Sequence, residues 1–209
     1  MTFNTITHAQ TFNSLPINTG INGEYSCYTQ ILEKLYKIMT YMTNKHCRVL
    51  FIRFDVRFPQ WYRTTGENDE ISHLFKMLKE NSKNMGIDFQ FLWAREQSQE
   101  KHQHYHCITI LDGSRVRSYH RFLSVVTEAW GHVLGCEAVG LVDWCDRDQN
   151  GIRIDRPQAQ ASPDTHAQQT QAFNQSFSAC FYWGSYLAKE NQKANTPKGV
   201  RRYGASQLK

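Results

Sequence analysis

Two β-rich runs joined by a short polar connection constrain the fold of this chain more than any other feature. The runs extend over residues 88–96 and 102–111, and only residues 97–101 separate them. Such a connection is too short for a crossover helix, so the two strands are expected to pair antiparallel as a hairpin. Asp112-Gly113 then ends the second strand. The sequence therefore predicts an antiparallel sheet built around this hairpin.

Hydrophobic periodicity places helices and further strands around the hairpin. Helical spacing of apolar residues predicts helices over 28–42, 70–84 and 118–134. The segment nearest the C-terminus, 170–191, is also expected to be a helix. β-rich runs at 48–59 and 138–144 predict two more strands, and a brief strand is expected at 152–154. The polar segment 146–169, broken by Pro157 and Pro163, is expected to be a long loop. This order predicts an α+β fold with an antiparallel sheet and flanking helices.

The length of the chain suits one compact domain with a real core, since it has 209 residues and 40% hydrophobic content. We expect an irregular N-terminal arm over residues 1–27, one domain over residues 28–192 and a basic C-terminal tail over residues 193–209. The six cysteines form no CxxC pair, which favours reduced thiols. No signal peptide or membrane span is expected, because no window approaches about 20 apolar residues. These features predict a soluble, cytoplasmic protein with no membrane partner.

The charge of the chain favours an anionic partner. The formal net charge is +5 at neutral pH. Such a balance is compatible with nucleic acid but does not identify it, because many basic proteins bind nothing anionic. The chain contains no GxxxxGK phosphate loop, so it carries no helicase motor of its own.

A run of alternating histidines on the second hairpin strand predicts part of a metal site. The run is His102-Gln103-His104-Tyr105-His106. Side chains alternate between the faces of a strand, so His104 and His106 share one face, about 7 Å apart along the strand. His102 continues the alternation but is expected in the turn, and the sequence leaves open which pair binds a metal.

A carboxylate on the neighbouring strand would complete this metal site. Glu96 precedes His104 by eight positions, and the hairpin brings it close to the start of the histidine strand. Two imidazoles and one carboxylate leave positions open for water and a phosphate oxygen. Mn²⁺ or Mg²⁺ suits phosphodiester chemistry, and Zn²⁺ stays an alternative. Asp55 is the reserve candidate for the oxygen ligand.

The helix nearest the C-terminus carries two tyrosines and a lysine at regular spacing. The motif is Tyr182-Trp-Gly-Ser-Tyr186-Leu-Ala-Lys189. At about 100° per residue, Tyr182, Tyr186 and Lys189 fall on one side of the helix. The opposite side already has an apolar face, formed by Phe173, Phe177, Cys180, Phe181 and Gly184. The phenols are therefore available for chemistry, although a packing role beside Trp183 stays open for Tyr182.

Together these motifs resemble those of the HUH endonuclease superfamily. The two-tyrosine spacing is similar to that of phage rolling-circle initiators. More narrowly, RFDVRF, the E…HYH pair, SYLAK and GVRRYGASQ look like the prophage-borne, inovirus-type replication protein family, over about residues 48–207. The resemblance implies a ferredoxin-like or RRM-like sheet with the metal on one face and the tyrosine helix laid across it. The HxHxH run is longer than the family motif.

The resemblance also implies an activity: metal-dependent nicking and rejoining of single-stranded DNA, which initiates rolling-circle replication of a phage or related mobile element in a bacterial host. Tyr186 is then the nucleophile, Tyr182 a second nucleophile, and Lys189 the residue that steadies the charge. The substrate would be a replication origin, with a hairpin as one form of it. A host helicase and a host polymerase would be recruited.

Several arginines are candidate contacts to the DNA backbone. The set comprises Arg53, Arg57, Arg95, Arg115, Arg117, Arg201 and Arg202. Arg53, Asp55 and Arg57 share one strand face, and three charged residues on a core strand are unusual. We expect that face to line the DNA.

Other functions remain open at this point. A transposase or a relaxase would use the same chemistry. A non-catalytic, RRM-like module would bind single strands through aromatic residues but would leave the tyrosine motif unexplained. A structural zinc protein using His102, His104 and Cys107 has poor spacing for tetrahedral closure.

Overall fold

A computed structural model describes residues 5–97, 103–145, 150–191, 193 and 195–208. His102 and most of the hairpin connection lie outside these residues. Within the part described, no helix is long and apolar enough to cross a membrane.

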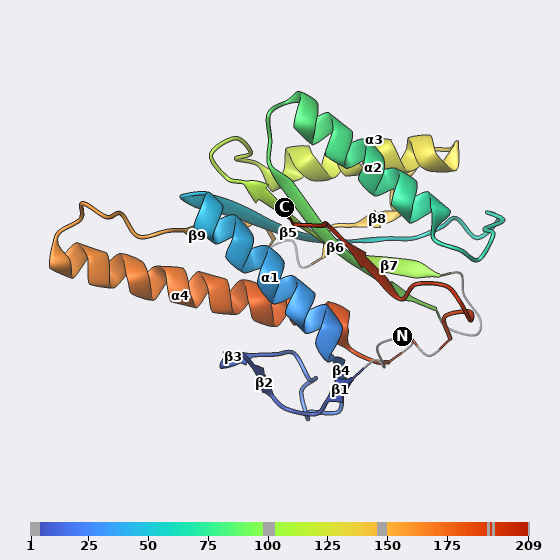
Figure 1. The fold of residues 1–209 in the computed structure, drawn as a ribbon. Helices are drawn as coiled ribbons and strands as arrows, with labels where there is room; N and C mark the ends of the chain where they lie inside the picture. Colours follow the sequence, from blue (N-terminus) through green and yellow to red (C-terminus); the bar gives the residue numbers. More distant parts are fainter. Residues whose placement is uncertain (1–4, 98–102, 146–149, 192, 194, 209) are drawn as a thin grey trace.

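The elements follow one another as a mixture of helices and antiparallel strands (Figure 1). In chain order they are β1 (Ile6–Thr7), β2 (Thr11–Phe12), β3 (Leu15–Pro16), β4 (Cys27–Tyr28), α1 (Thr29–Lys45), β5 (Arg48–Val56), α2 (Asp69–Asn84), β6 (Phe89–Glu96), β7 (His104–Asp112), α3 (Tyr119–Leu134), β8 (Val142–Asp143), β9 (Ile152–Asp155), α4 (Pro163–Ser185), the 3₁₀ turn η1 (Tyr186–Ala188) and β10 (Tyr203–Ala205).

The central sheet is antiparallel throughout and is built on the predicted hairpin. Its strand order is β10-β6-β7-β5-β8, and β9 pairs with another part of β5. In the hairpin, Glu96 pairs with His104 and Ala94 with His106. On the other side of β7, Asp55 pairs with His106. The α+β architecture expected from the sequence is thus confirmed, and three strands bring the polar residues of the motifs into adjacent positions.

Helices cover both faces of the sheet (Figure 1). Helices α2 and α3 pack on one face, where their apolar stripes meet residues such as Phe54, Trp93 and Tyr105. Helices α1 and α4 pack on the other face, against residues such as Phe51 and Ile108. The two cores follow from strand alternation, because successive side chains of each strand point to opposite faces.

Local signals explain the ends of helices α3 and α4. The Ser118 hydroxyl accepts a hydrogen bond from the Arg121 N–H, and Gly135 closes α3 with φ +67°. Ser162 caps α4 in the same way, and Pro163 occupies the first turn. The expected helix start at Thr170 is therefore wrong, because Ser162-Pro163 begins a helix rather than prolonging a loop. Helix α4 also ends at Ser185, before the expected end at Asn191.

The two ends of the chain are more ordered than the sequence suggests. Strand β10 pairs with β6, from Tyr203 against Ala94 to Ala205 against Leu92, so part of the expected basic tail is a strand of the central sheet. In the N-terminal arm, Ile17 and Cys27 are buried in the core beneath α1 and α4. Both segments hold few apolar residues in regular order, which is why periodicity did not detect them.

The strand expected at 138–144 is shorter in the structure. Only Val142–Asp143 pairs, with Val56 and Asp55 of β5. Just before it the chain turns, because the Leu141 N–H donates to the Ala138 carbonyl and Gly140 has φ +80°. Only glycine adopts such a φ without strain, so the turn shortens the strand.

Candidate active site

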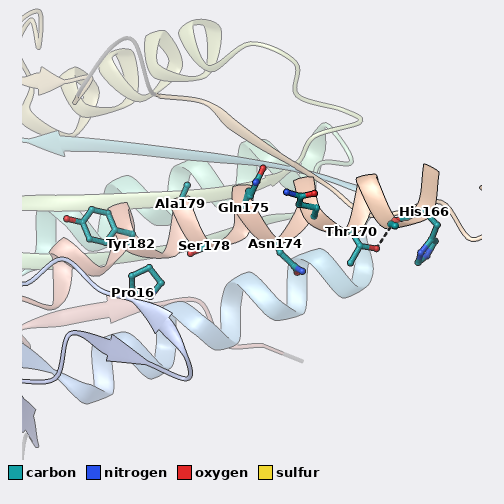
Figure 2. Close-up of a pocket in the computed structure, with 10 residues that line it drawn as sticks. Pro16, His166, Thr170, Asn174, Gln175, Ser178, Ala179 and Tyr182 are labelled. Carbon is teal, nitrogen blue, oxygen red and sulfur yellow. Dashed lines mark hydrogen bonds between the residues drawn. The ribbon is translucent and has the colours of Figure 1, made fainter. Parts of the chain in front are cut away.

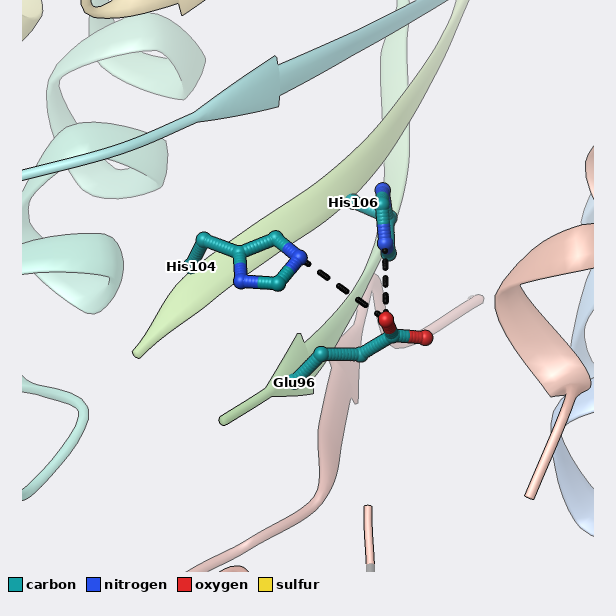
Figure 3. A group of neighbouring side chains, drawn as sticks. All are labelled: Glu96, His104 and His106. Atoms are coloured by element: carbon teal, nitrogen blue, oxygen red, sulfur yellow. Dashed lines mark ion pairs between the residues drawn. The ribbon is translucent and has the colours of Figure 1, made fainter. Parts of the chain in front are cut away.

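One carboxylate and two imidazoles meet at the end of the hairpin, on the face covered by α1 and α4 (Figure 3). Oε2 of Glu96 lies 3.1 Å from Nε2 of His106 and 3.7 Å from Nε2 of His104. The three ligand atoms lie within 4.8 Å of one another. Cross-strand pairing places Glu96 beside His104, and alternation along β7 adds His106 two residues later. The structure thus brings together the three residues predicted as metal ligands.

Asp55 has a different position from that of a direct ligand. Its Oδ1 lies 2.7 Å from Nδ1 of His106. With Nδ1 donating to Asp55, the Nε2 lone pair of a neutral His106 points towards Glu96 and His104. Carboxylates often orient metal-binding imidazoles in this manner. Asp55 is therefore placed to orient His106.

The donor set fits a divalent metal ion. Nε2 of His106 is buried and makes no hydrogen bond with any residue that the structure describes. Burial and the nearby positive charge of His106 lower the pKa of His104 to about 4. Burial alone would raise the pKa of Glu96, but His106 and Lys193 outweigh it and lower that pKa to about 2. Near neutral pH the site thus offers an anionic oxygen and an imidazole lone pair, which Mn²⁺ or Mg²⁺ with open coordination positions would accept.

The pKa of His106 responds to the same neighbours. Burial alone would lower it, but the contacts with Asp55 and Glu96 raise it above the ordinary value. Burial likewise opposes ionisation of Asp55, yet the hydrogen bond with His106 lowers the pKa of that carboxyl. The two carboxylates thus favour a positive charge at His106, where a metal cation would replace the proton.

Tyr186 lies against this group because α4 ends in a tight turn. Its ring centroid is 5.2 Å from that of His106, nearly perpendicular to it. The Lys189 ammonium donates a hydrogen bond to the Tyr186 hydroxyl and lies 3.5 Å from Oε2 of Glu96. The 3₁₀ turn of η1 brings Lys189 close to Tyr186. A phenol, an ammonium and the candidate metal ligands therefore share one site.

Packing of α4 and the N-terminal arm supports this position. A Cβ at Gly184 would lie 2.9 Å from Cδ2 of Leu35 and 3.0 Å from Cδ1 of Ile108, so glycine lets the end of α4 approach α1 and the sheet. The Ser185 hydroxyl accepts a hydrogen bond from the Asn18 N–H at 2.7 Å. The predicted arm thus holds the last turn of the tyrosine helix.

Tyr182 occupies a different surface from Tyr186. Its side chain is 43% exposed and borders a groove along α4 that Pro16, Ser178 and Ala179 also line (Figure 2). Among the described residues, no hydrogen bond or ring contact joins the Tyr182 side chain to the Glu96–His104–His106 group. The role of Tyr182 as a second nucleophile stays a prediction.

The predicted DNA contacts divide into three situations. Arg95 is fully buried, and its guanidinium donates to the carbonyls of Gly66 and Glu67. The expectation that Arg95 touches DNA is therefore wrong, because it points to the α2–α3 face and has no surface to offer.

Arg53 lies within the site itself. Its guanidinium carbon is 4.4 Å from the centre of the Tyr186 ring, and its Nε is buried with no hydrogen-bond partner among the described residues. The side-chain amide of Asn150 holds the Arg53 backbone on both its N–H and its carbonyl. Arg53 therefore places a positive charge beside Tyr186, which favours an anionic group there.

The remaining arginines lie nearer the surface. Arg57 is exposed and pairs with Asp143 at 3.3 Å, and its charge also acts on His104. Arg201 is exposed, while Arg202 is half-buried over the ring of Tyr28. Arg115 and Arg117 are exposed beside α3. Their contacts with DNA stay predictions.

Sequence reasoning missed Lys193, which it assigned to the tail. This side chain is completely buried, and its ammonium lies 2.8 Å from Oε1 of Glu96. Burial lowers the pKa of Lys193 to about 8, although Glu96 opposes the shift. No periodicity marks Lys193, since its burial depends on the fold of the residues around it.

Comparisons with known proteins identify the family. The family model of the YagK/YfjJ C-terminal domain matches residues 7–206. No curated protein matches the chain. Among solved structures, the catalytic domain of the Adeno Associated Virus type 5 Rep protein is similar at 13% identity, covering 63% of this chain and 99% of that one, with a TM-score of 0.35. A likeness this loose assigns no property to the chain. The match over residues 7–206 shows that the chain belongs to the YagK/YfjJ C-terminal domain family.

Proposed function

We propose that this protein is a metal-dependent nickase of single-stranded DNA that uses Tyr186 as its nucleophile. One observation carries the proposal. The Lys189 ammonium contacts both the Tyr186 hydroxyl and, at 3.5 Å, the carboxylate of the candidate metal ligand Glu96. A nucleophile, a cation that contacts its oxygen and a candidate metal site thus lie side by side.

The residues suit transfer of a phosphodiester to tyrosine. The Tyr186 oxygen attacks phosphorus, the bond from phosphorus to the 3′ oxygen breaks, and a 5′-phosphotyrosine forms. The phenol proton leaves to solvent, and the departing 3′ oxygen takes a proton from water. A bound Mn²⁺ or Mg²⁺ would supply Lewis-acid activation of the scissile phosphate, held by His104, His106 and Glu96.

Two cations of the chain lie against Tyr186. The Lys189 ammonium donates a hydrogen bond to the Tyr186 oxygen, so a positive charge stands where this oxygen would meet the phosphate. The Arg53 guanidinium lies over the same ring, so its positive charge favours an anionic phosphate beside Tyr186. Because the bond energy stays in the phosphotyrosine, rejoining to a 3′-OH needs no nucleotide cofactor.

The biological role that we propose is initiation of rolling-circle replication for a phage or related mobile element, with host helicase and polymerase as partners. The motifs that resemble inovirus-type replication proteins support this role over a transposase or a relaxase. A substrate containing a single-stranded origin, alone or in a hairpin, follows from that role.

A nicking assay tests the chemistry. Labelled single-stranded oligonucleotides of mixed sequence are incubated with Mn²⁺ and the protein, and denaturing gels report covalent adducts. We expect an adduct that requires Mn²⁺, disappears with a chelator and is absent from Tyr186→Phe. Tyr182→Phe, four residues away, is the matched control. Tight DNA binding without an adduct on any substrate would instead indicate a non-catalytic binding module.

A further inference from the structure

Lys193 is a buried lysine beside a candidate metal ligand. Its side chain is 0% exposed. The ammonium donates hydrogen bonds to Oε1 of Glu96 at 2.8 Å and to the Lys189 carbonyl at 2.7 Å. Burial of an ammonium is unfavourable unless other groups replace its water. These two acceptors replace the water, so they hold the Lys193 ammonium next to Glu96.

The two oxygens of Glu96 have different partners. Oε1 accepts the hydrogen bond from Lys193, whereas Oε2 faces Nε2 of His106 and His104 at 3.1 and 3.7 Å. A carboxylate that rotates freely about its last bond can present either oxygen, or both, to a metal ion. The contact with Lys193 restricts that rotation and leaves Oε2 facing the imidazoles, with the Lys189 ammonium also 3.5 Å from Oε2.

The backbone around Lys193 is anchored independently of Glu96. The Lys193 N–H donates to the Glu190 carbonyl at 3.0 Å. Glu190 is in turn bound to Ser26, through its backbone N–H at 2.8 Å and its carboxylate at 2.6 Å. Because Lys193 extends from a fixed backbone, it can orient Glu96 rather than follow it.

We propose that Lys193 is a positioning residue that presents Glu96 to a divalent metal ion through Oε2 alone. The inference rests on the metal site of the proposed function, but not on DNA cleavage. The sequence alone does not indicate this role for Lys193, because Lys193 lies among other lysines and arginines near the C-terminus. Groups that hold a metal ligand from behind typically change metal affinity about 10–100-fold when removed.

The test compares Mn²⁺ binding by the full chain and by Lys193→Met, which keeps the length of the side chain and removes its charge. Electron paramagnetic resonance of free Mn²⁺ gives the dissociation constant without any DNA. We expect Mn²⁺ affinity to fall about 10–100-fold in Lys193→Met. Lys198→Met, an exposed lysine of the same segment, is the matched control and should bind like the wild type.

A double-mutant cycle with Glu96→Gln separates positioning from general damage. If Lys193 acts through Glu96, Lys193→Met lowers Mn²⁺ affinity in the wild type but adds almost nothing in Glu96→Gln. An equal loss in both backgrounds would overturn the inference. The double variant removes both buried charges together, so neither charge is left buried without its partner in the comparison with Glu96→Gln.

Two failures are distinguishable. Absence of Mn²⁺ binding in the wild type would defeat the metal site of the proposed function, and this inference with it. Wild-type binding that Lys193→Met leaves unchanged would defeat the inference alone.

Discussion

The two faces of the central sheet differ most at the end where β7 begins. On the α1–α4 face, apolar side chains such as Ile108 give way to His106 and His104. On the α2–α3 face, the intervening Tyr105 and Cys107 stay in an apolar core that Trp130 helps to close. Each pair of adjacent residues on β7 thus serves two purposes, one chemical and one structural.

One strand can therefore supply side chains to the candidate metal site on one face and to the apolar core on the other face. Alternation assigns residues to faces, so a shift of one position would exchange them. Arg95 and Glu96 illustrate this on β6. Glu96 points to the site, whereas its neighbour Arg95 is buried on the other face against backbone carbonyls. Stability and metal binding should therefore respond to different substitutions.

The largest expected effect lies on the structural face. Trp130→Ala should lower the free energy of unfolding by about 3–5 kcal/mol, because it empties a fully buried position. It also removes the donor to the Arg57 carbonyl. Urea denaturation measures the change, with the partly exposed Val125→Ala on the same helix as control. Loss of Mn²⁺ binding in folded Trp130→Ala would break the separation of the two faces.

The next effect lies on the chemical face. His104→Ala should weaken Mn²⁺ binding at least about 100-fold, since it removes a ligand rather than a supporting group. Its side chain is 25% exposed, so the free energy of unfolding should change by less than about 1 kcal/mol. Calorimetric titration and thermal unfolding supply both values, and exposed His120→Ala is the control. A large loss of stability with intact Mn²⁺ binding would reverse the assignment.

A smaller effect on Mn²⁺ affinity is expected at Asp55, which contacts the candidate ligand His106 rather than the metal. Asp55→Asn retains the size of the side chain but removes the charge that orients His106. Mn²⁺ affinity should fall about 10–100-fold, less than for His104→Ala. Asp143→Asn is a suitable control. Asp143 pairs with Asp55 across β5 and β8, but its carboxylate is exposed. An unchanged Mn²⁺ affinity in Asp55→Asn would show that the imidazole needs no such support.

The smallest effect sharpens the comparison between the two phenols. Tyr182→Phe should leave the rate of the first nicking step within about 2-fold of the wild type, because its hydroxyl makes no contact with the metal group among the described residues. Any defect should be confined to rejoining, where the second-nucleophile prediction places it. Single-turnover nicking and strand-transfer assays measure the two steps. A first step as impaired as in Tyr186→Phe would place both phenols in one site.

Local patterns predicted the fold and the grouping of Glu96, His104 and His106. The short hairpin connection fixed an antiparallel pair, and alternation then placed His104, His106 and Glu96 on one face. The hairpin and the alternation of side chains depend only on residues close in sequence or on the pairing of two neighbouring strands. The caps at Ser118 and Gly135 are equally local, and α3 ends close to its expected boundaries.

Features that depend on distant segments were missed or wrong. Helix α4 stops at Ser185 because Asn18 of the N-terminal arm and the packing around Gly184 fix its end. Lys193 is buried by contacts that no local pattern reveals. Arg95 was expected at the DNA because its charge was visible, while the loop carbonyls that hold it were not. The role of a buried polar residue such as these can be predicted only when its hydrogen-bonding partners are known.

Identification of the residue that becomes linked to DNA tests the central claim most directly. The covalent adduct formed with Mn²⁺ is digested with protease and nuclease, and tandem mass spectrometry locates the modified side chain. We expect a nucleotide attached to Tyr186 and no adduct when Mn²⁺ is withheld. Attachment at Tyr203 or at another residue distant from Glu96 and His106, or an adduct that forms without a divalent metal, would contradict it.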